Sequence, residues 1–312
     1  MHDFWTNLTV GREPPVSGEL PLFRPDVSRS ASFSALSSIV LAVLLGSISA
    51  VGGRSPEELP LPNRDEFLSQ AREKIKASND LLTKYTFRLT ETRKDLDGDG
   101  RTRKTTVKTY DVFPHPDEEL TYRRLISNDG RSVSQKKLES QDRQYSKRLR
   151  NKQKAGSGPW KPSRRERMIQ GVFGLFDYTL RGRERIGDYQ TIVVDFEPKP
   201  GVEPPDRDLN LLKKFRGTAW INESDHEMVQ LETELMDTVS FGFGIVARFY
   251  EGTRIYVKRC RVNDEIWLVE ESRFKLVARV LLLKSLRFEV TNRYSDYQRC
   301  DVDTSVNFQG TR

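Results

Sequence analysis

The sequence predicts a mainly β fold of the α+β type, with about a dozen antiparallel strands, a helix near the N-terminus and a second helix in mid-chain. Three observations lead to this prediction. Long runs in the second half alternate between apolar and polar residues, whereas two earlier segments repeat apolar residues at helical spacing. The 312 residues include 16 Phe, 10 Tyr and 4 Trp, which is enough for a substantial core, and no internal repeat is visible.

The first 53 residues differ from the rest of the chain. The apolar run Ala35–Gly53 has a core, Leu36–Leu45, of the length found in secretory signal sequences and shorter than the about 20 residues of a membrane span. The polar stretch before it is unusually long, which leaves open either a start site set too far upstream or a cytoplasmic tail before an uncleaved anchor. We expect a signal peptide and export to the periplasm, or an inner-membrane anchor if the run is not cleaved. Residues 1–53 then comprise an N-terminal tail and the signal peptide or anchor, and residues 54–312 form a single domain.

The domain is predicted to begin with an amphipathic helix. Asn63, followed three residues later by Glu66, is typical of a helix start because the two side chains can satisfy free backbone N–H groups. Apolar residues then recur at helical spacing, with Ser78 among them: Phe67, Ala71, Ile75, Leu82 and Tyr85. We expect a helix of about five turns.

The stretch ETRKDLDGDGRTRK, Glu91–Lys104, has the alternating aspartates of a calcium loop. Counting from Asp95, the twelfth position of such a loop should hold a bidentate Glu, and here it is Thr106. Arg101 and Arg103 stand where ligands should be. The stretch also joins two runs that alternate like strands. We therefore predict a β-hairpin turn and no metal site.

The middle of the chain combines strands with helical and charged segments. The runs LTYRRLIS and RSVSQKKL, joined by the turn NDG, are predicted to be strands. Residues 139–154 are almost wholly polar, and a solvated helix and a mobile loop both remain open. From Ser163 to Phe176 the apolar residues return to helical spacing. Gly171 and Gly174 each cost this helix about 1 kcal/mol, so we expect it to be weakly held.

The second half of the chain is rich in predicted strands. They lie in the runs GDYQTIVVDFEPKPG, FRGTAWIN, HEMVQLETELM, IVARFYEGTRIYVKRCRV, EIWLVEESRFKLVARV and LLLKSLRFEVTNRYSDYQ. Alternation over long antiparallel strands predicts a sheet with one apolar and one polar face.

No catalytic motif stands out. His2, His115 and His226 lack the spacing of a zinc pair, and there is no glycine-rich nucleotide-binding motif. We therefore expect a protein that is not an enzyme and needs no cofactor. Cys260 and Cys300 could pair in an exported chain or stay as two free thiols, and their spacing does not decide between these states.

The chain is basic overall. Lys and Arg exceed Asp and Glu by 52 − 45 = 7, which favours anionic partners. Basic clusters gather between Gln141 and Arg167. They indicate either a solvated face or a contact with an anionic head group or an acidic protein partner. Nucleic acid is not expected as a partner, because aromatic residues flank these clusters instead of alternating with the charges.

An apolar sheet face next to two amphipathic helices could enclose a cavity for a greasy ligand. The residues expected to form its wall are large apolar side chains of the strands and the mid-chain helix: Phe87, Leu89, Phe173, Phe176, Trp220, Leu231, Phe274 and Phe288. Plain core packing of the same residues is the alternative.

The order of features resembles that of a known group. An apolar leader, an amphipathic helix running into YTFRLTETRK, several strands, a helical insertion, and then YQTIVVDFEPKPG and FRGTAWINESDHEMVQLETEL resemble the outer-membrane lipoprotein-sorting carriers. These are the LolA and LolB proteins and the related envelope-stress regulator RseB. The similarity covers Asn63 to Tyr297. It implies a half-open antiparallel β-barrel with helices on its concave side and a hydrophobic cavity for acyl chains.

The function that this resemblance implies is non-catalytic binding of lipid or lipoprotein acyl chains in the periplasm, as in lipoprotein sorting and transport within the cell envelope. The alternative is an envelope protein-interaction scaffold or stress sensor, whose barrel is filled by its own side chains.

Overall fold

The computed structural model describes residues 60–155, 164–204, 207–241, 247–280 and 284–300. The predicted leader and the tail before it lie outside these residues. The helices of the described part are α3 (Arg64–Leu82), α4 (Gln135–Ala155), α5 (Arg164–Leu175) and α6 (Arg207–Leu212). The strands are β1 (Tyr85–Leu96), β2 (Thr102–Phe113), β3 (Tyr122–Asn128), β4 (Arg131–Ser132), β5 (Phe176–Ile186), β6 (Tyr189–Pro198), β7 (Phe215–Asn222), β8 (Met228–Leu235), β9 (Val239–Phe241), β10 (Ala247–Phe249), β11 (Arg254–Val262), β12 (Ile266–Val280) and β13 (Lys284–Arg299).

The strands form one antiparallel sheet in the order β4-β3-β2-β1-β13-β12-β11-β8-β7-β6-β5, and the short β9 and β10 attach beside β12. Within the described residues β4 and β5, at the two ends of this order, do not pair with each other, so the sheet stays open. The predicted half-open barrel of about a dozen strands is confirmed. The C-terminal strand β13 lies between β1 and β12 and joins the first hairpin to the rest of the sheet.

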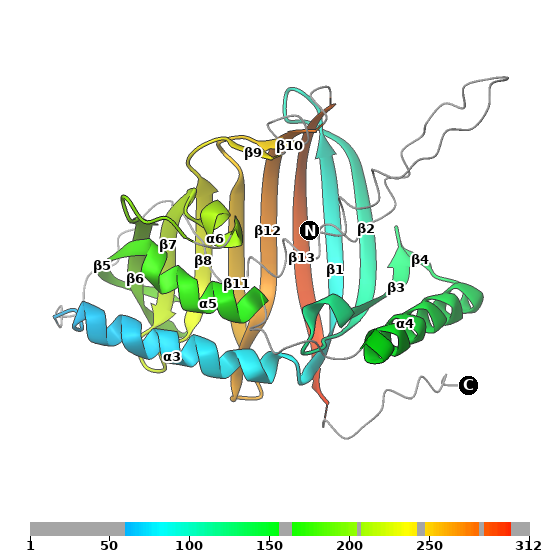
Figure 1. Cartoon of the computed structure of the whole chain (residues 1–312), viewed down its shortest axis with the longest axis horizontal. Coiled ribbons are helices and arrows are strands. Elements are labelled where there is room, and N and C mark those ends of the chain that lie inside the picture. Colours follow the sequence, from blue (N-terminus) through cyan, green and yellow to red (C-terminus); the bar gives the residue numbers. More distant parts are fainter. Residues whose placement is uncertain (1–59, 156–163, 205–206, 242–246, 281–283, 301–312) are drawn as a thin grey trace. The chain divides into compact units, whose positions relative to one another are not determined.

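Helices cover part of one sheet face. Figure 1 shows α3, α5 and α6 in front of the strands from β5 to β11, while α4 lies beside β3 at the other end of the sheet. Helix α5 packs against both α3 and α6. The prediction of an N-terminal helix and a mid-chain helix on the concave side is therefore confirmed.

Helix α3 begins as its sequence predicts. The side-chain oxygen of Asn63 accepts hydrogen bonds from the backbone N–H groups of Asp65 and Glu66, each at 3.1 Å. These bonds satisfy two of the four backbone donors that a helix start leaves free. Phe67 and Ala71 of the predicted apolar stripe are buried.

The aspartate-rich stretch is the turn of the β1–β2 hairpin, as predicted. Asp97 accepts hydrogen bonds at its Oδ1 from the backbone N–H groups of Asp99 at 3.0 Å and Arg101 at 2.9 Å. Gly100 has a φ of +81°, a conformation that glycine adopts without strain. The carboxylate of Asp97 therefore serves the turn itself.

The prediction of a strand over RSVSQKKL is wrong. Strand β4 covers only Arg131–Ser132, and α4 begins at Gln135 and continues through the whole charged segment. The physical reason lies in contacts with β3. Gln141 bonds both the N–H and the carbonyl of Leu125, and the ring of Tyr145 stacks on Tyr122 at 4.3 Å. These two residues lie one helical turn apart, so in a helix their side chains lie on the same side and both reach β3.

Strand β5 and helix α6 are additions to the predicted elements. Helix α6 corrects the interpretation of one glycine in α5. A Cβ atom on Gly171 would lie 2.5 Å from Cδ1 of Leu209 in α6, so the missing side chain permits close packing of the two helices. Gly174 has open space around its Cα. The buried side of α5 consists of Met168, Ile169, Val172 and Leu175.

Candidate functional site

Strand register places one row of side chains across the concave face, because cross-strand partners share a face. From β5 to β2 the row consists of Leu180, Val194, Ala219, Leu231, Val257, Ser272, Asn292, Glu91 and Lys108. It is apolar on β5 to β11, the strands that the helices cover. It is polar on β12, β13, β1 and β2, and we call its last four residues the polar row.

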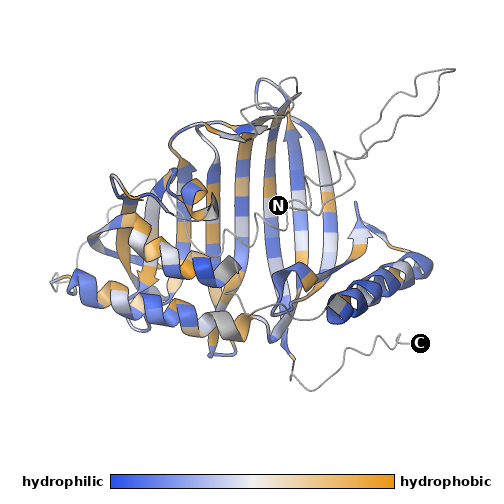
Figure 2. Ribbon diagram, viewed as in Figure 1, coloured by the Kyte–Doolittle hydropathy of each residue, from blue (hydrophilic) through white to orange (hydrophobic). Residues whose placement is uncertain are grey.

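Directly beside the polar row, β12 and β13 present three successive apolar pairs on the same face. We call these pairs the apolar strip: Phe274–Val290, Leu276–Phe288 and Ala278–Leu286. Phe274, Leu276 and Leu286 are only partly buried. Figure 2 shows the alternation of hydrophobic and hydrophilic residues along these two strands. In Figure 1 the described helices α3, α5 and α6 lie to one side of the upper parts of β12 and β13.

Asn292, at the inner end of the apolar strip, is buried with only part of its hydrogen bonds made. Its side chain is 5% exposed. The Nδ2 group donates to Oγ of Ser272 at 3.3 Å, and that hydroxyl lies 3.4 Å from the hydroxyl of Tyr294. The Oδ1 atom is buried and has no hydrogen-bond partner among the described residues. A buried acceptor without a donor costs about 1–3 kcal/mol, so this oxygen favours any ligand that supplies one.

Charged side chains lie next to Asn292 on β1, β2 and β3. Arg123 Nη2 lies 3.5 Å from Oε2 of Glu91. Lys108, the cross-strand partner of Glu91, is partly buried and makes no ion pair within the described residues. Arg93 holds its guanidinium 4.0 Å from the ring centroid of Phe288 in the apolar strip. The concave face thus changes from apolar to charged within two strands.

Most of the predicted wall residues lie on the concave side: Phe87, Leu89, Phe173, Phe176, Leu231, Phe274 and Phe288. They belong to separate groups. Phe87 and Leu89 pack with Tyr110 and Val112, whereas Phe173 and Phe176 both contact the ring of Tyr178. The cavity that they were expected to line stays a prediction.

Trp220 lies on the opposite face of the sheet from the other predicted strand residues. Its cross-strand partners are Val193 and Gln230. Its indole Nε1 donates to Oε2 of Glu184 at 2.7 Å. The end of β7 is buried on both faces, and Ala219 and Ile221 are as well covered as Trp220. The pattern of apolar residues in the sequence therefore does not reveal whether Trp220 or its neighbours Ala219 and Ile221 face the helices.

Sequence reasoning missed the polar row, although one signal was readable. Along β13, Leu286, Phe288 and Val290 stand at alternate positions on the apolar face. Asn292 occupies the next position of the same phase, where an apolar residue is expected. A polar side chain in the apolar phase of a strand indicates a buried hydrogen bond or a site.

Helix α4 presents a second surface. Its inner side is held by Asp142, which accepts bonds from the Tyr122 hydroxyl at 2.6 Å and from Arg124 at 2.8 and 2.9 Å. Burial and this carboxylate raise the pKa of Tyr122. The outer side carries exposed cationic side chains: Lys136, Lys137, Arg143, Lys147, Arg150 and Lys154. Glu139 is the acidic residue of the helix that is exposed with them, so this face is strongly positive.

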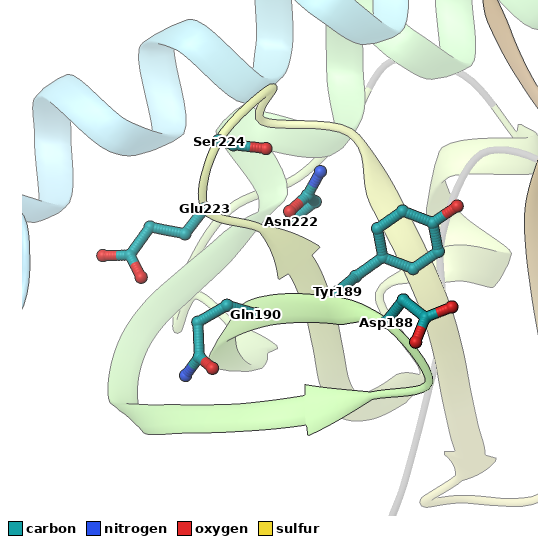
Figure 3. Close-up of a pocket in the computed structure, with 6 residues that line it drawn as sticks. All are labelled: Asp188, Tyr189, Gln190, Asn222, Glu223 and Ser224. Carbon is teal, nitrogen blue, oxygen red and sulfur yellow. The ribbon is translucent and has the colours of Figure 1, made fainter. Parts of the chain in front are cut away.

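A surface pocket of about 300 Å³ lies between the β5–β6 and β7–β8 turns (Figure 3). Its lining residues are Asp188, Tyr189, Gln190, Asn222, Glu223 and Ser224. Two of its polar groups serve the fold. Asn222 donates to Asp225 at 2.8 Å, and Glu223 pairs with Arg183 at 2.7 Å. In Figure 3 the carboxylate of Glu223 points away from the other side chains, so the pocket gathers no reactive constellation.

The remaining candidates for chemistry have structural contacts. The ring of His226 packs 5.0 Å from that of Phe67, and His115 Nδ1 accepts the backbone N–H of Asp117 at 2.9 Å. Cys260 and Cys300 are both free thiols, and burial raises the pKa of the Cys260 thiol. Among the described residues, no three His, Cys, Asp or Glu side chains gather as metal ligands do. No helix of the described part is long and apolar enough to cross a membrane.

No family model and no curated protein sequence match this chain. Solved structures of similar fold include a LolA superfamily protein from Nitrosomonas europaea, at 11% identity and a TM-score of 0.31, with 78% of this chain and 96% of that chain covered. An outer membrane lipoprotein-sorting protein domain from Vibrio parahaemolyticus has 11% identity, the same coverage and a TM-score of 0.32. The Pseudomonas aeruginosa MucA/MucB complex matches at 8% identity and a TM-score of 0.23, over 74% of this chain and 99% of that chain.

The first two of these structures bear the names of the group that the sequence resembles. Identities of 8–11% and TM-scores of 0.23–0.32 do not say what this chain binds. The chain is similar in fold to LolA-type proteins.

Proposed function

We propose that the protein is a non-catalytic binding protein of the periplasm that holds the acyl chain of a lipid or lipoprotein against its concave face. The apolar strip supports this proposal. Its three cross-strand pairs extend over about 14 Å of β12 and β13, and Phe274, Leu276 and Leu286 within it keep part of their surface accessible. A hydrocarbon chain laid along the strip gains about 0.8 kcal/mol for each methylene that it buries.

The proposal places residues 54–312 in the periplasm as one domain behind the segment 1–53. A sheet that is apolar on one side and open at its ends suits a carrier, because a ligand can enter without unfolding the core. No catalytic step is required of it.

The experiment is displacement of a fluorescent fatty acid from the full chain, with a matched pair of variants. Leu276→Gln changes the apolar strip. Val277→Gln changes the next residue, which is equally partly buried and faces the other side of the sheet. We expect Leu276→Gln to weaken binding about tenfold and Val277→Gln to leave it unchanged. Absence of saturable binding by the unmodified chain refutes the proposal.

A second candidate, an envelope interaction scaffold, rests on the cationic outer face of α4. Removing the segment would also remove Asp142 and Tyr145, which bind β3. Charge reversal is therefore the better test. Lys147→Glu with Arg150→Glu alters exposed residues only. If the face binds an acidic protein partner, capture of that partner is lost while the thermal midpoint stays the same. Unchanged capture removes this candidate.

A further inference from the structure

The apolar strip ends at a polar site that the proposed function does not explain. On the next rung of β12 and β13, about 7 Å from Phe274 and Val290, the cross-strand pair is Ser272–Asn292. Both side chains are buried. A ligand that lies on the strip with its polar end toward this rung presents its first polar atoms to Asn292.

Asn292 offers an acceptor at this point. Its Nδ2 group donates to Ser272, and its buried Oδ1 has no partner in the part of the chain that the structure describes. The end of an ester-linked chain, or a fatty acid carboxylate, carries oxygen acceptors only and leaves Oδ1 unmatched. An amide-linked chain carries an N–H group next to its carbonyl carbon and can donate to Oδ1.

Charged side chains also lie beside Asn292. Glu91 lies one strand further along the polar row, and Arg123 pairs with it at 3.5 Å. Lys108 lies one strand beyond Glu91, and it is partly buried without an ion pair in the described part of the chain. An anionic group of the ligand is therefore best placed past the amide, toward Lys108.

We propose that Asn292 selects amide-linked acyl chains over ester-linked ones, with Lys108 attracting an anionic group that follows the amide. The ligand class is an N-acylated amino acid or an N-acylated polypeptide. This inference rests on the proposed function, because it assumes that the chain lies on the apolar strip. It adds a preference for the amide linkage, which the apolar strip by itself does not distinguish from an ester linkage.

Two probes that differ in one atom test the selection. N-dodecanoylglycine and dodecanoyloxyacetic acid have the same chain and the same carboxylate, but the second has an ester oxygen in place of the N–H. We expect calorimetry on the full chain to show about tenfold tighter binding of the amide, because the ester leaves Oδ1 without a donor. This comparison uses the unmodified protein, so it does not depend on a variant that folds.

Variants then assign the effect to a residue. Asn292→Leu should bind both probes equally, with the ester probe near its original affinity as the folding control. Thr291→Leu, on the opposite face of β13, should keep the preference. Lys108→Gln should weaken both probes alike, by up to about fivefold.

The outcomes separate the two proposals. Equal binding of the two probes by the unmodified protein overturns the selection and leaves the acyl-binding function standing. A preference that survives in Asn292→Leu also overturns it. Failure of both probes to bind overturns the acyl-binding function and the selection together.

Discussion

The guanidinium of Arg93 on β1 lies over the ring of Phe288 on β13, at 4.0 Å from its centroid. Phe288 is 2% exposed although it belongs to the apolar strip, and this contact covers part of it. Arg93 itself is 27% exposed. A cation over an aromatic ring at such a site contributes about 0.5–1 kcal/mol, and the pair that Arg93 forms with Asp95 at 2.8 Å is partly exposed, so a hydrocarbon chain can displace the guanidinium.

Removing this cover should strengthen ligand binding. Arg93→Ala frees the Phe288 ring, and we expect a fluorescent fatty acid to bind about two- to fivefold more tightly. Lys94→Ala is the control, because Lys94 is an exposed neighbour on the other face of β1. Weaker binding by Arg93→Ala would show that the arginine holds the ligand instead of competing with it.

A buried ion pair should dominate the stability of the region beneath α3. Arg259 donates to Glu227 at 3.0 Å, both side chains are 8% exposed, and Ser78 of α3 donates to the same carboxylate. Removing one partner of a buried pair costs about 3–5 kcal/mol, and we expect this loss for Arg259→Met in urea unfolding.

The neighbouring residue supplies the control for this measurement. Lys258 pairs with Glu270 at 2.8 Å, and both side chains are exposed by more than 40%. Lys258→Met should therefore cost less than about 1 kcal/mol. Equal losses of unfolding free energy for Arg259→Met and Lys258→Met would contradict the dominant role of the buried ion pair.

The two glycines of α5 should respond in opposite directions to alanine. Gly171→Ala forces a methyl group against Leu209 and should destabilise the protein by about 1–3 kcal/mol. Gly174→Ala meets nothing within 4 Å and should stabilise it by about 0.5 kcal/mol, because alanine favours the helix. Thermal unfolding of both variants checks the prediction, and a gain in stability for Gly171→Ala would disprove the close packing of α5 on α6.

Glu232 should destabilise the fold at neutral pH. Burial raises the pKa of its carboxyl group above the usual value. The folded state therefore holds this proton at a pH where the unfolded state has lost it, and stability falls as the pH rises through that window. We expect Glu232→Gln to raise the unfolding free energy at pH 7 and to have less effect near pH 4.

Glu234, two residues further on the same face of β8, is the matched control. It pairs with Arg216 at 2.7 Å and with Arg254 at 3.5 Å. Glu234→Gln removes these attractions and should lower the unfolding free energy at pH 7 or leave it unchanged. Similar pH profiles for the two variants would contradict the role of burial at Glu232.

The sequence predicts local structure well where local physics decides it. The Asn63 cap and the β1–β2 turn depend on residues within a few positions of one another, and both are confirmed. The start of α4 at Gln135 could not be predicted in this way, because the contacts that hold this helix against β3 come from Gln141 and Tyr145 further along it.

The site shows the same limit. Alternation predicts an apolar face, but it does not say which face of the doubly buried β7 meets the helices, so Trp220 could not be placed. The polar row joins Ser272, Asn292, Glu91 and Lys108 from four strands. Such a grouping follows from strand order, which depends on contacts between residues far apart in the chain.

The insertion of β13 between β1 and β12 bears on how the chain matures. Strand β2 of the first hairpin can pair with β3 early, but β1 has no partner on its other side until β13 has been made. Until then the edges of β1 and β12 remain uncovered and prone to pair with other chains. The two parts of the sheet are thus joined only when β13, the last strand of the described part, takes its place between β1 and β12.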